Sequence, residues 1–435
     1  MSLDPSAADA RPEVPERGAA LLRRRLRGLA LDVTPLRVSR PFRDLLIGDA
    51  VSVIGTQVTT VAVPLQVYEQ TRSAFAVGLV GVAGLVPLIL FGLYGGAVAD
   101  AVDRRKLVLV TTVGQAGLSA VLLGQALAGL HQTWLLYVVV ALQAGLFALV
   151  SPARQAFVPR LLPAELLPAA NALRQVEFNI GVVVGPLLAG VLVGTSGYAS
   201  AYGLDAVSFA ASLWAVSSLP AMAPEGGGRK AGLASVVEGL RFLGTRPVLL
   251  LTFVIDLIAM IFAMPRALFP ALAEQVYGGG AQTAGALYSA LAAGALLGAL
   301  GGGWFGRIQR QGLAVLAAVV AWGLAITLFG LSDQLWVGLL MLAVAGASDM
   351  ISAVFRSSIL QAAAPDEMRG RLGGVFIVVV AGGPRLGDAR AGGAVGLVGL
   401  QGAVVAGGLA CVGLTLAVGA LIPRFRSYDA RAPYA

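Results

Sequence analysis

The sequence predicts an all-α polytopic membrane protein, in which twelve transmembrane helices form two pseudo-symmetric bundles of six. Three observations predict this fold: the composition, the recurrence of long apolar runs, and the placement of the cationic residues. Of the 435 residues, 57% are hydrophobic and only 12% are charged, and the mean hydropathy is +0.82. A soluble domain needs more polar surface than this, whereas the 57 glycines suit helices that pack closely in lipid.

The apolar runs indicate where the helices lie, because a transmembrane helix needs about 20 mostly apolar residues. We expect spans near residues 44–67, 74–99, 107–130, 134–157, 169–195, 201–221, 247–272, 283–303, 312–331, 335–360, 371–396 and 401–422. The predicted domains are a basic N-terminal tail at 1–43, a first bundle at 44–221, a connector at 222–246, a second bundle at 247–422 and a tail at 423–435.

The cationic residues predict the orientation. All but four of the 31 Lys and Arg residues fall in segments that lie on one side of this arrangement, and the exceptions are Arg72, Arg266, Arg385 and Arg390. Loops rich in Lys and Arg stay in the cytoplasm, so we expect both termini to be cytoplasmic. The formal charge of +8 then faces the anionic inner leaflet of the lipid bilayer, and nucleic acid is not needed as a partner.

Several kinds of site are not expected from this sequence. The single Cys411 and the single His131 allow no intramolecular disulfide, no cysteine metal site and no histidine cluster. A phosphate-binding loop of the G-x-x-x-x-G-K-[ST] type does not occur, which argues against an ATP-driven pump. A membrane enzyme would need a clustered catalytic set or a soluble domain, and the sequence has neither. We therefore expect no catalytic residue, no cofactor and no metal.

The link between the second and third spans, GGAVADAVDRRK at residues 95–106, is very short and strongly charged. The absence of a spacer predicts that its two flanking helices are antiparallel neighbours. Arg104, Arg105 and Lys106 place the link on the cytoplasmic side. Taken alone, this pattern is typical of a charged hairpin that only ends two membrane helices.

The two halves of the sequence resemble each other. Residues of the first half recur at nearly constant offsets in the second: Asp49, Arg154, Pro163 and Glu165 correspond to Asp256, Arg356, Pro365 and Glu367. The link at 95–106 has a degraded counterpart in GGGWFGRIQR at 301–310. Parallel halves related by an axis along the membrane normal are typical of one transporter architecture.

With these residues identified, the chain resembles the major facilitator superfamily of transporters. The superfamily signature between the second and third helices is matched at Gly96, Asp100, Arg104 and Arg105. Ala101 and Asp103 depart from it, at positions where a basic residue and a glycine are usual. The resemblance implies a monomer that works by alternating access, with Asp100 and Arg104 in a gate at the cytoplasmic face.

A second motif lies in the fifth span. Gly181, Gly185, Pro186 and Gly190 resemble the motif of exporters that exchange their substrate for protons. Small residues four apart are also routine contacts between membrane helices. Two longer stretches, PRLLPAELLPAANALRQVEFN and GGPRLGDARAG, resemble the enterobactin and macrolide exporter branch.

Four carboxylates inside the predicted spans are candidates for proton coupling: Asp256, Glu177, Asp49 and Asp349. A charge at the centre of a membrane helix costs about 2.5–3.5 kcal/mol, so each one needs a reason. Burial penalises the charged form of a carboxyl group, which suits a residue that must bind and release a proton. Asp256, which has no cation at helical spacing, is the preferred candidate, followed by Glu177 and Asp49.

Structural ion pairs are the alternative interpretation of these carboxylates. Arg174 precedes Glu177 by one helical turn, and Arg356 lies on the same helix as Asp349, so each pair could be self-neutralising. Asp49 is close enough to the cytoplasmic end of its helix to be solvated there.

Charged residues also occur towards the outer ends of the spans. Arg385 and Asp388 follow a Gly-Gly-Pro sequence that weakens the eleventh helix. They are expected either to line the substrate cavity or an external gate, or to neutralise each other at the outer interface. Asp205, near the outer end of the sixth span, is expected at the membrane interface.

The favoured hypothesis is a proton-driven exporter of a small amphipathic molecule, such as a siderophore, a macrolide or another drug-like metabolite, in a bacterial inner membrane. One alternative is a uniporter or importer of the same fold, because these motifs do not determine the direction of transport. A membrane sensor that binds its ligand without moving it is an alternative from another class.

Overall fold

The computed structural model describes residues 32–222, 233–363 and 365–429. Of the predicted N-terminal tail at 1–43, connector at 222–246 and C-terminal tail at 423–435, residues 1–31, 223–232 and 430–435 lie outside the described residues. The described chain is helical, apart from turns and an isolated bridge between Arg310 and Asp429. The predicted all-α fold is thus confirmed.

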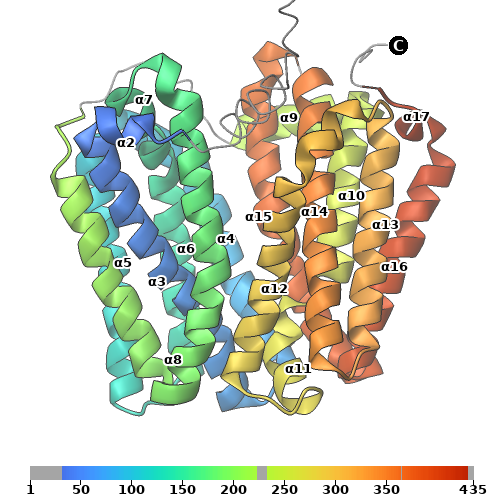
Figure 1. The fold of residues 1–435 in the computed structure, drawn as a ribbon, viewed down its shortest axis with the longest axis horizontal. Helices are drawn as coiled ribbons and strands as arrows, with labels where there is room; N and C mark the ends of the chain where they lie inside the picture. The colour runs from blue at the N-terminus through green and yellow to red at the C-terminus, as the bar shows by residue number, and fades with distance from the viewer. Residues whose placement is uncertain (1–31, 223–232, 364, 430–435) are drawn as a thin grey trace, which may run out of the picture.

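The first group of helices in Figure 1 runs from α2 to α8. Its members are α2 (Thr34–Val38), α3 (Arg40–Thr71), α4 (Ala74–Ala101), α5 (Arg104–Leu127), α6 (Thr133–Gln155), α7 (Phe157–Leu161), η1 (Ala164–Leu166) and α8 (Leu167–Ser217). Inside α8, Gly197 has φ 76° and ψ 179°, a conformation outside the helical region that glycine adopts readily. This bend divides α8 into two antiparallel segments, which correspond to the fifth and sixth predicted spans.

The second group runs from α9 to α17. Its members are α9 (Leu233–Thr245), α10 (Pro247–Ala263), η2 (Arg266–Leu268), α11 (Phe269–Gln275), α12 (Ala281–Leu300), η3 (Gly302–Arg307), α13 (Gln311–Gly330), α14 (Leu335–Ala363), α15 (Asp366–Val398), α16 (Leu400–Leu421) and α17 (Pro423–Arg426). The seventh predicted span is broken after Ala263, where Pro265 cannot continue the helix and η2 leads into α11.

Ten helical stretches of the described chain are long and apolar enough to cross a membrane. One of the ten, Ala164–Ser217, contains the bend at Gly197. The 33-residue helix α15, which carries several charged residues, is not among the ten. Each predicted span nevertheless coincides with helix, so the chain is a multi-pass membrane protein.

The short links between the helices are stabilised by capping side chains. Ser39 and Ser73 accept hydrogen bonds from the backbone N–H groups of Phe42 and Ala76, both over 3.3 Å, and so begin α3 and α4. Asp103 begins α5 by accepting from the N–H of Lys106 over 3.0 Å. Each cap satisfies an N–H that the first turn of a helix leaves unpaired.

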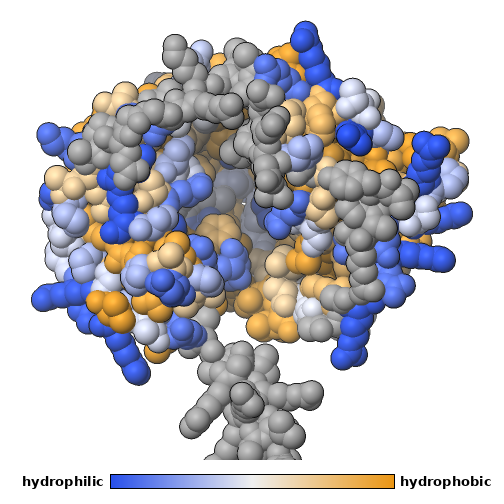
Figure 2. All heavy atoms as spheres, turned by 90° about the horizontal axis from the view of Figure 1, so that it is seen from above, coloured by the Kyte–Doolittle hydropathy of each residue, from blue (hydrophilic) through white to orange (hydrophobic). Residues whose placement is uncertain are grey.

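The two faces of the molecule differ. We call the face with α2, α9 and α17 the terminal face, and the face with α11 and the bend of α8 the far face (Figure 1). Figure 2, which looks onto the terminal face, shows a hollow between the two groups of helices. The groups touch where α12 packs against α8 and α15 packs against α4.

Candidate functional site

A buried ion pair lies inside the first group of helices. Arg154 of α6 contacts Oδ1 of Asp49 on α3 over 2.6 Å. Its other terminal nitrogen donates to the hydroxyls of Thr112 on α5 and Ser212 on α8, over 3.1 and 3.2 Å. A single guanidinium therefore connects four helices, and all the groups around it are hydrogen-bonded as buried polar groups must be.

The second group contains the equivalent pair with one carboxylate more. Arg356 of α14 contacts Asp256 of α10 directly and lies 3.8 Å from Asp349 on its own helix. The Asp256 side chain is only 5% exposed, whereas that of Asp349 is 37% exposed. We call these three residues the carboxylate–arginine triad.

The triad and the pair are related by the repeat that the sequence predicts. Asp49 and Arg154 of the first half occupy the places of Asp256 and Arg356 in the second half. With all groups ionised, the pair is neutral, while Asp349 leaves the triad with one negative charge. The two halves therefore share a geometry but differ in charge.

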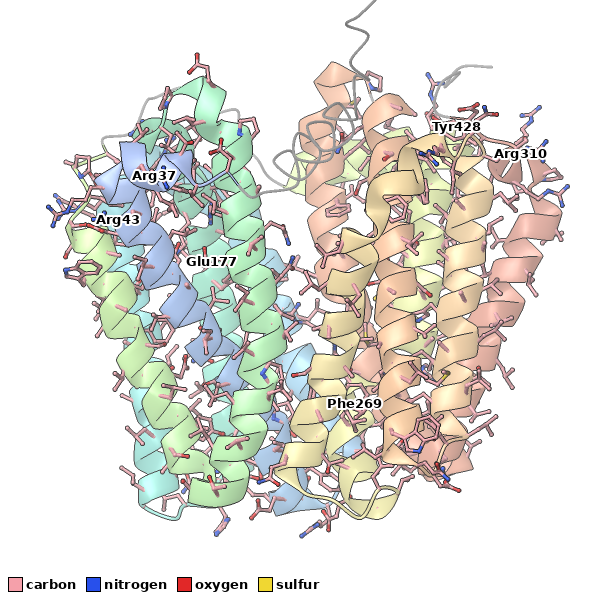
Figure 3. The ribbon with its side chains drawn as sticks, in the orientation of Figure 1. Arg37, Arg43, Glu177, Phe269, Arg310 and Tyr428 are labelled. Atoms are coloured by element: carbon pink, nitrogen blue, oxygen red, sulfur yellow. The ribbon has the colours of Figure 1, made fainter. Side chains whose placement is uncertain are left out.

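Glu177 lies on the first segment of α8, in the half of the molecule nearer the terminal face (Figure 3). In the described part of the chain it forms no ion pair or hydrogen bond, either with Arg174 or with any other residue. The charges of Asp49, Arg174 and Arg154 act on it through space. Among the four candidate carboxylates, Glu177 is thus the one without a direct partner in the described residues.

The link at 95–106 contacts its own group of helices. Arg104 contacts Asp100 one turn earlier over 3.3 Å, and Arg105 donates to the backbone oxygens of Val216 and Ser217 at the end of α8. Asp103, the departure from the superfamily signature, also accepts from the N–H of Met222 over 3.1 Å. The space around Gly96 is open, because an added Cβ would meet nothing within 4 Å. In this conformation Arg105 joins α5 to the end of α8, and Arg104 joins α5 to α4.

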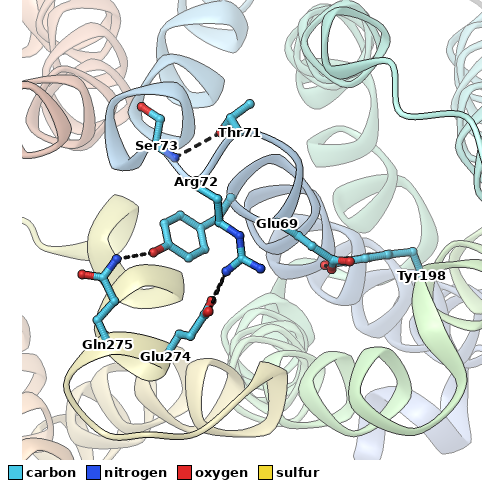
Figure 4. A network of polar contacts seen from close by, with 8 residues as sticks. Glu69, Thr71, Arg72, Ser73, Tyr198, Glu274 and Gln275 are labelled. Carbon is cyan, nitrogen blue, oxygen red and sulfur yellow. Dashed lines mark hydrogen bonds and ion pairs between the residues drawn. The ribbon is translucent and has the colours of Figure 1, made fainter.

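At the far face, polar side chains connect the two groups directly (Figure 4). Arg72, which ends α3 with φ 53°, contacts Glu274 of α11 over 2.6 Å. The Gln275 side chain donates to the Tyr68 hydroxyl, also over 2.6 Å. Glu69 accepts from Tyr198 of α8 over 2.5 Å, which braces this end of α3 within its own group. We call the contacts of Arg72 and Tyr68 with α11 the far-face contact.

Glycines bring the backbones of the two groups together in the same half of the molecule. A Cβ added at Gly190 would lie 2.7 Å from the Ala281 carbonyl oxygen, and one at Gly285 would clash with the Pro186 carbonyl oxygen. The Ser289 hydroxyl donates to the Val183 carbonyl oxygen over 2.7 Å. The glycines at 181 and 185 instead face Val53 and Gln57 of α3. The exporter-like motif thus serves one contact inside the first group and one between the groups.

Arg385 and Asp388 lie where α15 meets α4. They bind different backbone groups: Arg385 donates to the Ala381 oxygen over 2.7 Å, and Asp388 accepts from the N–H of Ala267 over 3.0 Å. A Cβ added at Gly78 of α4 would lie 2.5 Å from the Asp388 backbone oxygen. Both residues therefore lie at the contact between the two groups of helices.

The interface location predicted for Asp205 is wrong. This residue is 1% exposed and lies in the core of the first group, where Thr59 and Ser119 donate to its carboxyl group over 2.8 and 2.6 Å. The position of Asp205 in the sequence did not indicate that it is buried, because the two donors come from other helices. The partners of Asp256 and Arg72 were not predicted from the sequence, for the same reason. The partner of Asp256 could have been found, because Asp49 and Arg154 of the first half correspond to Asp256 and Arg356 of the second.

Comparison with known proteins identifies similar sequences. The transmembrane secretion effector family matches residues 31–432. The enterobactin exporter EntS of Citrobacter koseri is 32% identical over 370 residues, which cover 83% of this chain and 87% of that protein. The protein of the same name from Escherichia coli O1:K1 is 31% identical over the same shares of both chains.

Solved structures share the fold at much lower identity. The nucleoside transporter NupG superposes with a TM-score of 0.71 at 13% identity, over 89% of this chain and 100% of that chain. A bacterial homologue of the iron transporter ferroportin, solved in an inward-facing state, superposes with a TM-score of 0.65 at 14% identity, over 89% and 99%. These likenesses confirm the arrangement of the helices.

Proposed function

The chain belongs to the transmembrane secretion effector family of the major facilitator superfamily, and from this membership we propose that it exports a small amphipathic molecule in exchange for protons. Transport as such follows from the family. Export is supported by relatives that are named as exporters of enterobactin. The proposed substrate is a siderophore, a macrolide or another drug-like metabolite, and the transporter is proposed to act as a monomer.

The proposed mechanism is alternating access, in which the two bundles, at 44–221 and 247–422, rock about a central cavity. The far-face contact and the close packing of α8 on α12 support it, because among the described residues they join the two groups towards the far face (Figure 1). The hollow at the terminal face supports an opening on the other side (Figure 2). Opening the far face would require the ion pair of Arg72 and Glu274 to break.

The observation that carries the proton-coupling proposal is the charge of the triad. One guanidinium contacts two carboxylates, so the triad itself carries one net negative charge, on which Arg266 of η2 acts only through space. Two carboxylates that share a site bind one proton far more readily than an isolated one does. We assign the exchanged proton to Asp256 and Asp349 together. Protonation would weaken the hold of Arg356 on α10 and so favour a change of conformation.

Glu177 and Asp49 are proposed as a second, substrate-sensitive group. The carboxylate of Glu177 lacks a direct partner in the described residues, and it lies within electrostatic reach of the Asp49–Arg154 pair. A substrate or a proton that neutralised Glu177 would therefore change the balance of charge around Arg154, which holds four helices together.

Two further groups are proposed as gates. Gly96, Asp100, Arg104 and Arg105 would close the terminal face when the hollow shuts, since the signature residues bind only their own group now. The far side would be closed by Arg385, Asp388 and the glycine contacts of α8, which already pack the two groups together.

The terminal face is proposed to be cytoplasmic, in a bacterial inner membrane. Arg37, Arg43 and Arg310 lie at this face, as Figure 3 shows. Cations near the ends of membrane helices are retained on the cytoplasmic side. The conformation described here would then be open towards the cytoplasm, ready to receive a substrate for export.

The decisive experiment compares cells with and without the gene for the accumulation of enterobactin, other siderophores and macrolides. Lower accumulation in the cells that carry the gene is expected for at least one of these compounds. Sealed vesicles containing the purified protein, with an imposed pH gradient, then test the coupling. Movement of the compound opposite to the protons supports exchange.

The alternatives give different results in the same vesicles. A uniporter would equilibrate the compound without responding to the direction of the pH gradient. An importer would move it together with the protons. Binding without movement across a sealed bilayer would instead indicate a sensor.

A further inference from the structure

Asp205 has an environment unlike that of any carboxylate considered above. It lies on the second segment of α8, where this segment crosses α3 and α5, and only 1% of its surface is exposed. Thr59 of α3 and Ser119 of α5 both donate to one oxygen, Oδ2. Gln143 of α6 donates in turn to the Ser119 hydroxyl over 3.2 Å. Side chains from three other helices are thus linked to this one carboxyl group, two of them directly and Gln143 through Ser119.

The other oxygen of this carboxyl group, Oδ1, is buried and has no hydrogen-bond partner. The groups that face Asp205 from α3, α5 and α6 are all neutral. On its own helix the nearest titratable group is Tyr202, whose hydroxyl donates to Gln66 over 2.6 Å. No Lys or Arg among the described residues contacts Asp205.

Other buried carboxylates of this protein show that an ionised carboxylate in the core has a cationic partner. Asp49 and Asp256 each contact an arginine, in the two halves of the repeat. An ionised carboxylate in the core without such a partner is strongly destabilising, because its charge loses water and gains no countercharge. A neutral carboxylic acid whose hydroxyl lacks an acceptor is much less destabilising. The surroundings of Asp205 therefore favour the neutral acid.

A metal cation at Oδ1 would supply a countercharge, but hard cations take several oxygen ligands. The structure places no polar partner within hydrogen-bond distance of Oδ1. A proton needs no further ligand. The two hydroxyls are compatible with a proton on Oδ1, because Oδ2 can accept both hydrogen bonds as a carbonyl oxygen.

We propose that Asp205 is a proton-binding site in the core of the first bundle, with the proton on Oδ1 in the conformation described here. This site is separate from the triad, which lies in the other bundle. It does not depend on the proposed direction or substrate of transport, because it rests on the contacts of Asp205 alone. The protein would then hold a bound proton even where the triad is ionised.

Infrared spectroscopy of the full-length protein, purified in a detergent without carbonyl groups, tests this proposal. At neutral pH the wild type is expected to show a band of a protonated carboxylic acid that shifts in heavy water and is missing in Asp205→Asn. Because Oδ2 accepts two hydrogen bonds, Ser119→Ala should move this band to higher wavenumber without reducing its intensity. The matched control is Ser208→Ala, since the Ser208 hydroxyl donates to the backbone oxygen of Asp205 and not to its carboxyl group.

Two results would overturn the proposal. One is the same set of protonated-carboxyl bands in the wild type and in Asp205→Asn. The other is a band that disappears when Na⁺ replaces K⁺ in the buffer, which would assign the site to a metal cation. If Asp205→Asn does not fold, the comparison of Ser119→Ala with Ser208→Ala decides, and equal spectra of these two variants would reject a protonated Asp205.

Discussion

Replacement of Asp349 by asparagine is expected to abolish proton coupling while leaving the protein folded. Arg356 contacts Asp256 and lies 3.8 Å from Asp349, so the ionised triad carries one net negative charge. Asp349→Asn removes that charge and leaves the neutral pair of Asp256 and Arg356. A neutral pair has no need of a proton at physiological pH. The variant should therefore still move substrate down its gradient, but without a response to pH.

The size of the effect on stability follows from exposure. Two unit charges about 4 Å apart interact by about 4 kcal/mol at an effective dielectric constant of 20. The Asp349 side chain is 37% exposed, so solvent screens this interaction and its loss should cost about 1 kcal/mol or less. Asp256 is only 5% exposed, and removing one partner of a buried pair costs about 3–5 kcal/mol. Asp256→Asn should lose coupling too, but with clearly lower thermal stability than Asp349→Asn.

Transport by purified protein in sealed vesicles measures the coupling. One pH unit corresponds to about 1.36 kcal/mol, so the exchange of one proton per electroneutral cycle supports roughly a tenfold concentration gradient of substrate for each pH unit. The wild type should approach this ratio, and Asp349→Asn should stop at equal concentrations. Asp333→Asn is the matched control, because it removes a carboxylate that binds Gln401 outside the triad. Accumulation by Asp349→Asn equal to that of the control would refute the assignment of the proton to the triad.

Three further predictions concern the contacts between and within the bundles. Arg72→Glu should open the far face more often, because it replaces an ion pair between the two groups with two like charges, and Glu274→Arg in the same chain should restore closure. Unchanged distances between spin labels on the two bundles would contradict this. Arg154→Ala should lower the free energy of unfolding by about 3–5 kcal/mol, since Asp49 stays buried without a cation. An unchanged melting temperature would show that the pair does not stabilise the fold. Gly285→Leu should keep α12 away from α8, and the same spin-label measurement should then find the far face open. Transport by this variant at the wild-type rate would show that the contact is dispensable.

The membrane spans could be predicted well because the signal for them is local. A run of apolar residues is long enough to cross the bilayer whatever its neighbours are, so helices such as α4, α12, α13, α14 and α16 begin and end within a few residues of the predicted limits. The break of the seventh span at Pro265 and the bend at Gly197 could not be predicted as firmly. Both depend on the helices that pack against the chain on either side of the break or bend.

The candidate site was predicted only in part. The four carboxylates were identified from their depth in the membrane, but their partners were sought at helical spacing on the same helix. The structure pairs Asp49 and Asp256 with arginines of other helices, and leaves Glu177 apart from Arg174. A sequence pattern contains the spacing along one helix, whereas these contacts depend on which helices become neighbours.

By itself, the sequence determined the class of this protein. Its apolar runs require a membrane, its cations predict an orientation, and its repeat and signature indicate a two-bundle transporter. Only the tertiary structure decided which partner each charged group has: Arg154 for Asp49, Arg356 for Asp256, Glu274 for Arg72, and two hydroxyls but no cation for Asp205. The physical reason is that hydropathy acts over each segment separately, while the energy of a buried charge depends on the charged and polar groups around it, which come from distant parts of the chain.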